Sequence, residues 1–166
     1  MLDNARKYKE ELQSQFIDTW YDEKYKFYYV GGWHREYTPP EDDWERMCFV
    51  SLDKDKNILG CIEYSLDRNI GAAYDFSAIN FSDDKLTFGK DLHQVIDDIF
   101  CKLNIQRMEF NVVCGNPIEK SYDKMVAKFG GRIIGTRKRS TKLLDNKIYD
   151  DKIYEILRED YLTNKQ

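Results

Sequence analysis

The stretch that decides the fold runs from residue 115 to residue 140 and reads GNPIEKSYDKMVAKFGGRIIGTRKRS. Asn116 can cap a helix, Pro117 suits its first position, and Glu119 stands third, where a capping box needs a carboxylate. Apolar side chains then recur at helical spacing, at Ile118, Tyr122, Met125, Val126 and Phe129. A glycine pair ends this helix, and we predict a strand from Arg132 to Ser140.

A strand–helix–strand unit precedes this stretch. We predict strands from Gly71 to Asn80 and from Arg107 to Val113, with a helix from Phe88 to Leu103 between them and Thr87 as its N-cap. The apolar face of that helix consists of Leu92, Val95, Ile96, Ile99, Phe100 and Leu103. The unit is long enough for a right-handed crossover between two parallel strands.

Two predicted hairpins flank the unit. Met47 to Leu52 and Ile58 to Leu66 are apolar runs joined by a short polar connection, and Lys147 to Leu157 returns along the strand that ends at Ser140. The expected fold class is therefore α/β. Its sheet would be mixed and mostly antiparallel, with one parallel strand pair and helices on both faces.

The N-terminal region is harder to interpret. Leu2 to Trp20 has the apolar spacing of an amphipathic helix. The aromatic-rich segment from Tyr21 to Trp44 is predicted to be a loop with a short strand near Phe27 to Val30. The first twenty residues carry many charges and lack the apolar core of a secretory signal, so we expect a cytoplasmic protein.

Composition limits the function classes. The 166 residues suit a single domain, and a net charge of −4 argues against a nucleic-acid partner. The longest uncharged run, Phe110 to Ile118, is too short to span a membrane. Four well-separated cysteines are expected to be reduced and buried. With only two imidazoles, His34 and His93, and no ligand spacing beside them, we predict no metal site.

The order of these elements resembles the GCN5-related N-acetyltransferase (GNAT) family, which transfers an acetyl group from acetyl-coenzyme A (acetyl-CoA) to an amine. The resemblance covers Met47 to Leu157. Its most specific part is the stretch from 115 to 140, which looks like the family's Asn-initiated fourth helix, glycine turn and following strand. The segment KIYDDKIYEIL, from Lys147 to Leu157, is similar to the family's final strand.

The resemblance implies a division of the chain and a cofactor site. Residues 47–157 would form the core that binds acetyl-CoA, and residues 1–46 would shape the acceptor side. Three groups of residues would contact the cofactor. The pantetheine arm would lie along Phe76, Ser77, Ala78, Ile79 and Asn80; the pyrophosphate at Thr87, Phe88, Gly89, Lys90 and Asp91; and the thiol end beside Asn116, Lys120 and Ser121.

Direct acetyl transfer needs a base that deprotonates the amine and a group that protonates the departing thiolate. The family typically uses a strand carboxylate and a tyrosine on the fourth helix. The matching residues are Asp75, ahead of Glu63, as the base, and Tyr122 as the acid. Each also has a plain structural interpretation, as a solvated or ion-paired carboxylate or a packed aromatic ring.

The resulting prediction is an acetyl-CoA-dependent N-acetyltransferase acting on a primary amine of a small molecule or a protein. One alternative is a catalytically weak or inactive protein of this fold that senses acyl-CoA or binds another protein. Another is an unrelated α+β interaction domain. A homodimer is among the oligomeric states that the sequence leaves open.

Overall fold

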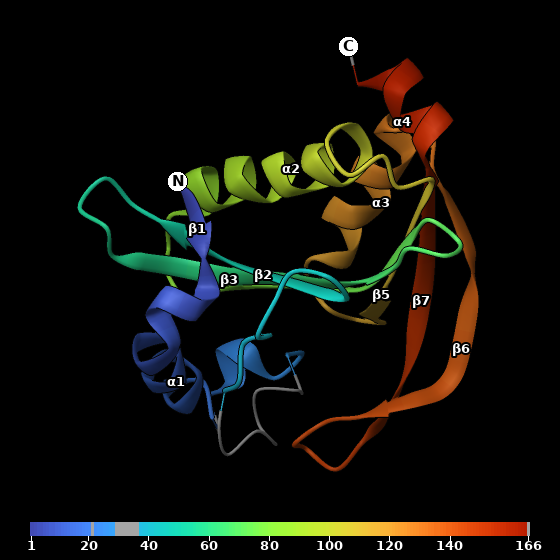
Figure 1. Ribbon diagram of the computed structural model, residues 1–166. Coiled ribbons are helices and arrows are strands. Elements are labelled where there is room, and N and C mark those ends of the chain that lie inside the picture. Colours follow the sequence, from blue (N-terminus) through green and yellow to red (C-terminus); the bar gives the residue numbers. More distant parts are fainter. Residues whose placement is uncertain (21, 29–36, 166) are drawn as a thin grey trace.

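The computed structural model describes residues 1–20, 22–28 and 37–165 (Figure 1). Seven strands form one sheet in the order β1-β2-β3-β4-β5-β7-β6. The strands are β1 (Leu2–Asn4), β2 (Arg46–Leu52), β3 (Ile58–Asp67), β4 (Ala72–Asn80), β5 (Arg107–Val113), β6 (Arg132–Lys142) and β7 (Ile148–Leu157). The helices are η1 (Ala5–Tyr8), α1 (Lys9–Asp18), η2 (Glu23–Tyr25), α2 (Lys85–Cys101), α3 (Glu119–Lys128) and α4 (Arg158–Asn164).

The predicted sheet is confirmed. β2 and β3 form one antiparallel hairpin, β6 and β7 form another, and β4 and β5 are the parallel pair. In Figure 1 the β2–β3 hairpin runs across the molecule, whereas β7 and β6 lie on the right at a steep angle to that hairpin. The sheet therefore has two halves that meet where β4 and β5 adjoin.

Helices cover both faces, as predicted. One core lies between the sheet and α2, α3 and α4, and its largest buried side chains include Tyr64, Phe100, Met108 and Tyr154. A second core lies under α1 on the opposite face of β2, β3 and β4, and contains Leu12, Phe16, Val50 and Ile79. Figure 1 shows α2 above the sheet and α1 below it.

Several local predictions were wrong. Leu2 to Trp20 does not begin as a helix, because its first residues pair with β2 as the edge strand β1. α4 was not predicted. Of the strand predicted from Phe27 to Val30, Phe27 lies in a turn, Tyr28 is not in a strand, and the last two residues lie outside the described residues.

The cysteines match the prediction only in part. All four cysteines are free, but only Cys48 and Cys61 are buried, whereas Cys101 is exposed. Cys101 occupies the last turn of α2 and lies off the apolar face of that helix. Among the described residues, no helix has the length and apolar character needed to cross a membrane.

Candidate functional site

The site begins where β4 and β5 part. Their parallel ladder consists of the pairs Ala72↔Arg107 and Ala73↔Met108, although β4 continues to Asn80 and β5 to Val113. From Tyr74 onward, the backbone edge of β4 that faces β5 has no strand partner among the described residues. Unpaired backbone N–H and C=O groups can accept an extended ligand as an additional strand.

A β-bulge lies at the same point. The register of β4 against β3 shifts between Glu63 and Ser65, so Asp75 and Phe76 both stand opposite Tyr64. Asp75 has a φ of 51°, in the left-handed region that residues other than glycine rarely adopt. Bulges and strained residues concentrate at functional sites because they redirect side chains out of the ladder. The Asp75 side chain is exposed there.

The residues after the bulge alternate between the two faces. Phe76 and Ala78 pack against the core under α2, while Ile79 belongs to the core under α1. Ser77 also faces α1, where its hydroxyl donates to Tyr28 Oη at 3.2 Å. The segment from Phe76 to Asn80 thus runs beside the parting with its side chains held on either side, which leaves its backbone edge facing β5.

Glu63 lies on the α1 face, beside Ser77 in the ladder. Arg46 Nη2 donates to Glu63 Oε2 at 2.6 Å, and the Glu63 side chain is only 17% exposed. Glu63 is thus an ion-paired carboxylate under the N-terminal segment. Asp75, in contrast, is exposed and forms no hydrogen bond or ion pair within the described part of the chain. Sequence analysis did not identify Arg46, since its pairing with Glu63 arises only from strand register.

The N-terminal segment bridges both sides of the parting on the α1 face. Tyr25 Oη donates to the carbonyl of Phe81, just after β4, at 3.1 Å. Two residues further on, the ring of Phe27 meets that of Tyr149 on β7 edge-on, with centroids 6.1 Å apart. Residues 22–28 therefore connect the loop after β4 to the β6–β7 hairpin.

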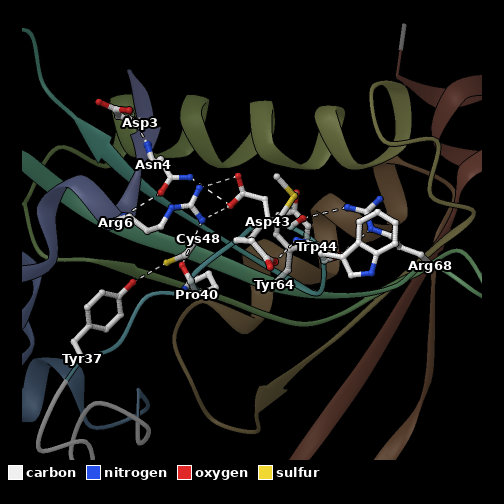
Figure 2. A network of polar contacts seen from close by, with 12 residues as sticks. Asp3, Asn4, Arg6, Tyr37, Pro40, Asp43, Trp44, Cys48, Tyr64 and Arg68 are labelled. Carbon is white, nitrogen blue, oxygen red and sulfur yellow. Dashed lines mark hydrogen bonds and ion pairs between the residues drawn. The ribbon is translucent and has the colours of Figure 1, made fainter.

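A polar network holds residues 37–45, just before β2 (Figure 2). Arg6 forms a bidentate ion pair with Asp43, at 2.8 and 3.1 Å. The Arg68 guanidinium lies 4.5 Å from the ring centre of Trp44 and donates to its carbonyl. Tyr37 Oη lies 2.7 Å from Cys48 Sγ. These contacts hold the residues before β2 against the sheet.

The start of α2 differs from the prediction. The helix begins at Lys85, and its N-cap is Asp84, whose Oδ1 accepts the N–H of Thr87 at 2.9 Å. The prediction of Thr87 as N-cap was wrong because Asp84 is an equally good capping residue and lies one turn earlier. The residues assigned to a pyrophosphate loop lie in the first two turns of the helix itself: Thr87, Phe88, Gly89, Lys90 and Asp91.

These five residues do not share one environment. Phe88 is buried in the core, whereas Gly89 and Lys90 are exposed. Asp91 Oδ2 accepts from Ser51 Oγ at 2.7 Å and pairs with the Met1 ammonium group at 2.8 Å. Asp91 is therefore directed toward β2 and not toward the start of the helix.

The start of α3 also differs in detail. Asn116 Oδ1 accepts the N–H of Ile118, and the regular helix starts at Glu119, so Asn116 precedes the cap position that was predicted for it. Glu119 Oε2 accepts from the backbone of Gly115 at 3.0 Å and not from that of Asn116 as a capping box requires. Lys120 and Ser121, the two residues after Glu119, are exposed.

One lysine of β7 ties α3 to the sheet. Lys152 pairs with Glu119 and with Asp123, the latter at 3.1 Å, and these carboxylates lie one turn apart on α3. Tyr154 Oη donates to Asp123 Oδ1 at 2.7 Å. Hydrogen bonds from Lys152 lower the pKa of Glu119, and those from Tyr154 and Lys152 lower that of Asp123.

Tyr122 lies on the inner face of α3. Its ring meets Phe110 of β5 edge-on at 5.3 Å and Tyr154 of β7 at 6.4 Å. The hydroxyl has no hydrogen-bond partner within residues 1–20, 22–28 and 37–165. Burial raises the pKa of Tyr122 to about 12, so the phenol stays protonated at neutral pH.

The fold is similar to that of known acetyltransferase structures. A single-residue variant of the spermidine N-acetyltransferase SpeG from Vibrio cholerae is similar with a TM-score of 0.73 at 17% identity, covering 100% of this chain and 99% of that one. The chain has the GNAT fold. The spermidine/spermine N-acetyltransferase SpeG with manganese ions, from the same organism, has a TM-score of 0.63 at 21% identity, covering 75% and 72%. No protein-family model and no curated protein sequence matches.

The GNAT fold implies acetyl-CoA, and the residues fit one part of it better than another. The unpaired edge of β4 suits the pantetheine arm, because it offers backbone donors and acceptors without a strand partner. The start of α2 suits the pyrophosphate poorly, because the Asp84 carboxylate already caps it. In the described part of the chain, no three His, Cys, Asp or Glu side chains cluster as a metal site would need.

Proposed function

We propose that this protein is an N-acetyltransferase that moves an acetyl group from acetyl-CoA directly to a primary amine. The observation that carries the proposal is the parting of β4 from β5 with a bulge at Asp75 at its apex. Such a bulge interrupts the ladder and frees backbone groups next to an exposed carboxylate. A merely structural sheet has no need of either feature at the parallel junction of β4 and β5.

The acetyl donor supplies an activated thioester when it is bound. Phe76, Ser77, Ala78, Ile79 and Asn80 would hold the pantetheine arm through their backbone, and Asn116, Lys120 and Ser121 would lie beside its thiol end. Residues 47–157 would thus form the cofactor-binding core, and residues 1–46 would complete the acceptor side.

Asp75 is the proposed base. An amine attacks only when neutral, so a carboxylate within reach, directly or through one water, must accept a proton. Asp75 is exposed and has no ion pair among the described residues, whereas Glu63 would first have to give up Arg46. For this reason Asp75 ranks above Glu63.

Tyr122 is the proposed proton donor for the departing thiolate. A phenol with a pKa of about 12 is fully protonated at neutral pH, and its hydroxyl is not engaged elsewhere within the described residues. Its ring is fixed between Phe110 and Tyr154, which would limit the loss of side-chain freedom in reaching a ligand.

The acceptor is proposed to be a primary amine because spermidine, the amine named for the SpeG proteins, is of this class. The α1 face supports this proposal, since Tyr28 and Ser77 line it near the parting, beside a Glu63 carboxylate that is paired with Arg46. An aromatic ring attracts a cationic amine through its face.

The test combines binding with turnover. Thermal denaturation with and without acetyl-CoA should show a raised midpoint, because a ligand of the native state stabilises it. An amine panel that includes spermidine should then release free thiol. Binding without turnover of any amine would favour the second candidate, an acyl-CoA-binding protein of the GNAT fold with weak or no catalysis. That candidate is favoured by the capped start of α2.

A further inference from the structure

We infer that Asp84 occupies the position at the start of α2 that a nucleotide diphosphate would need, and that its carboxylate lowers the affinity of this protein for coenzyme A. Donor binding would then depend mainly on the pantetheine arm. This inference rests on the proposed function, because it concerns how the same donor is held.

Most backbone N–H donors in the turn between β4 and α2 are already used within the protein. A diphosphate at a helix start is held by free backbone N–H groups. Here five of these groups are already bonded within the protein: Phe81 to the Leu59 carbonyl, Ser82 to Asn80 Oδ1, Asp84 to Ser82 Oγ, Lys85 to the Asp83 carbonyl, and Thr87 to Asp84 Oδ1. A diphosphate would have to displace several of them.

The start of α2 also carries negative charge from Asp84 and Asp83. The Asp84 carboxylate satisfies the partial positive charge of the helix start, as an incoming anion would. Hydrogen bonds from Thr87 hold the pKa of Asp84 below its ordinary value, so the carboxylate is ionised at neutral pH. Asp83 adds a second carboxylate, which is almost fully exposed and has Lys24 3.6 Å away. Lys85 and Lys90 are the nearby cations of α2, and both are exposed.

The position of Gly89 also disfavours a diphosphate at this helix start. A glycine in a diphosphate loop allows the backbone to approach the ligand closely. Gly89 instead lies within α2, after its first turn, and a methyl group at that position would touch nothing within 4 Å. The glycine therefore does not supply a cradle that would compensate for Asp84.

The decisive variant is Asp84→Asn, because asparagine caps helices as well as aspartate but carries no charge. Calorimetric titration would compare coenzyme A with pantetheine, which lacks the diphosphate and nucleotide. We expect Asp84→Asn to bind coenzyme A about three- to tenfold more tightly than the original protein. Pantetheine affinity should be unchanged, and the gain should shrink at high salt.

Asp83→Asn is the matched control, since it removes an adjacent charge that caps nothing. The ligand-free midpoint of each variant checks that the fold is retained. Equal coenzyme A affinity before and after Asp84→Asn, or an equal gain from Asp83→Asn, would overturn the inference alone. Failure of every variant to bind either coenzyme A or pantetheine would overturn it together with the proposed function.

Discussion

Two strand–helix arms flank the site, and they differ in how the helix is attached to the sheet. In both, a strand that lines the parting leads through a short turn into a helix: β4 into α2 and β5 into α3. At α3 the carboxylates of Glu119 and Asp123 are neutralised by Lys152 from the neighbouring strand. At α2 the Asp84 carboxylate has no such ion pair within the described residues. The α3 arm is attached to the sheet by Lys152, whereas the α2 arm is attached by Asp91, which binds Ser51 of β2 and the Met1 ammonium group, and by close packing.

The largest predicted difference between the two arms concerns the bulge in β4, at Asp75. Asp75→Asn keeps a residue type that tolerates the left-handed φ of 51°, so the fold should persist. If Asp75 is the base, kcat for amine acetylation should fall by about 10²- to 10⁴-fold with acetyl-CoA affinity unchanged. Steady-state kinetics with titrated donor measures both quantities.

Glu63→Gln is the matched variant on the adjacent strand. It removes a carboxylate that is already paired with Arg46, and a smaller loss of kcat is expected. The reverse order, with Glu63→Gln the more damaging, would transfer the role of base to Glu63.

Close packing of each arm can be tested at one glycine. A methyl group on Gly60 of β3 would clash with the Ile79 carbonyl of β4 and with the ring of Phe88 of α2. Gly60→Ala should therefore separate β3 from the α2 arm and destabilise the protein by about 1–3 kcal/mol, the usual cost of overpacking. Urea denaturation measures the change.

Gly131→Ala is the counterpart beside α3, where the added carbon would lie 2.6 Å from the Glu155 carbonyl. It should destabilise as well. Gly135→Ala on β6, with open space around it, serves as the control and should change stability little. Equal stability of all three variants would show that neither arm depends on close approach at these positions.

The ionic attachment of α3 predicts a smaller, pH-dependent effect. The pKa values of Glu119 and Asp123 are lowered from their ordinary 4.5 and 3.8, so both contribute stability above those values that is lost as pH falls through the folded-state values. Lys152→Met should lower Tm at pH 7 by roughly 2–4 °C. Its Tm should also fall less steeply than that of the original protein as the pH drops below about 5.

Lys138→Met provides the exposed comparison. Lys138 also pairs with a carboxylate, Asp150 at 2.8 Å, but its side chain is 77% exposed. Its replacement should leave Tm nearly unchanged. An acid dependence in Lys152→Met as steep as in the original protein would contradict the assigned role of Lys152.

These differences mark what sequence patterns can and cannot predict. Apolar runs located β2, β3 and β5 because these strands bury most of their apolar residues, whereas β6 is exposed along nearly its whole length. Apolar periodicity did not fix the start of α2, since Asp84 and Thr87 are both capping residues and periodicity defines only the face of a helix. β1 escaped because a three-residue strand has no detectable period and forms through distant pairing with β2.

The site was predictable to the extent that it follows local order. The resemblance identified the strands that part and the residues along them, which now form the proposal. The bulge at Asp75 and the Arg46–Glu63 pair depend on the register between neighbouring strands, and the Lys152 attachment depends on how α3 packs against β7. No local pattern encodes that register.

The smallest predicted effect tests the α2 arm at Gly89. If this glycine served a diphosphate loop, Gly89→Ala would impair coenzyme A binding. In the structure it occupies a helical position whose added methyl meets nothing within 4 Å. Alanine exceeds glycine in helix propensity by about 0.5–1 kcal/mol, so Gly89→Ala should stabilise the protein by that amount. Urea denaturation and coenzyme A titration on the same sample would decide, because weaker binding despite higher stability would mean that the ligand needs the backbone at Gly89 after all.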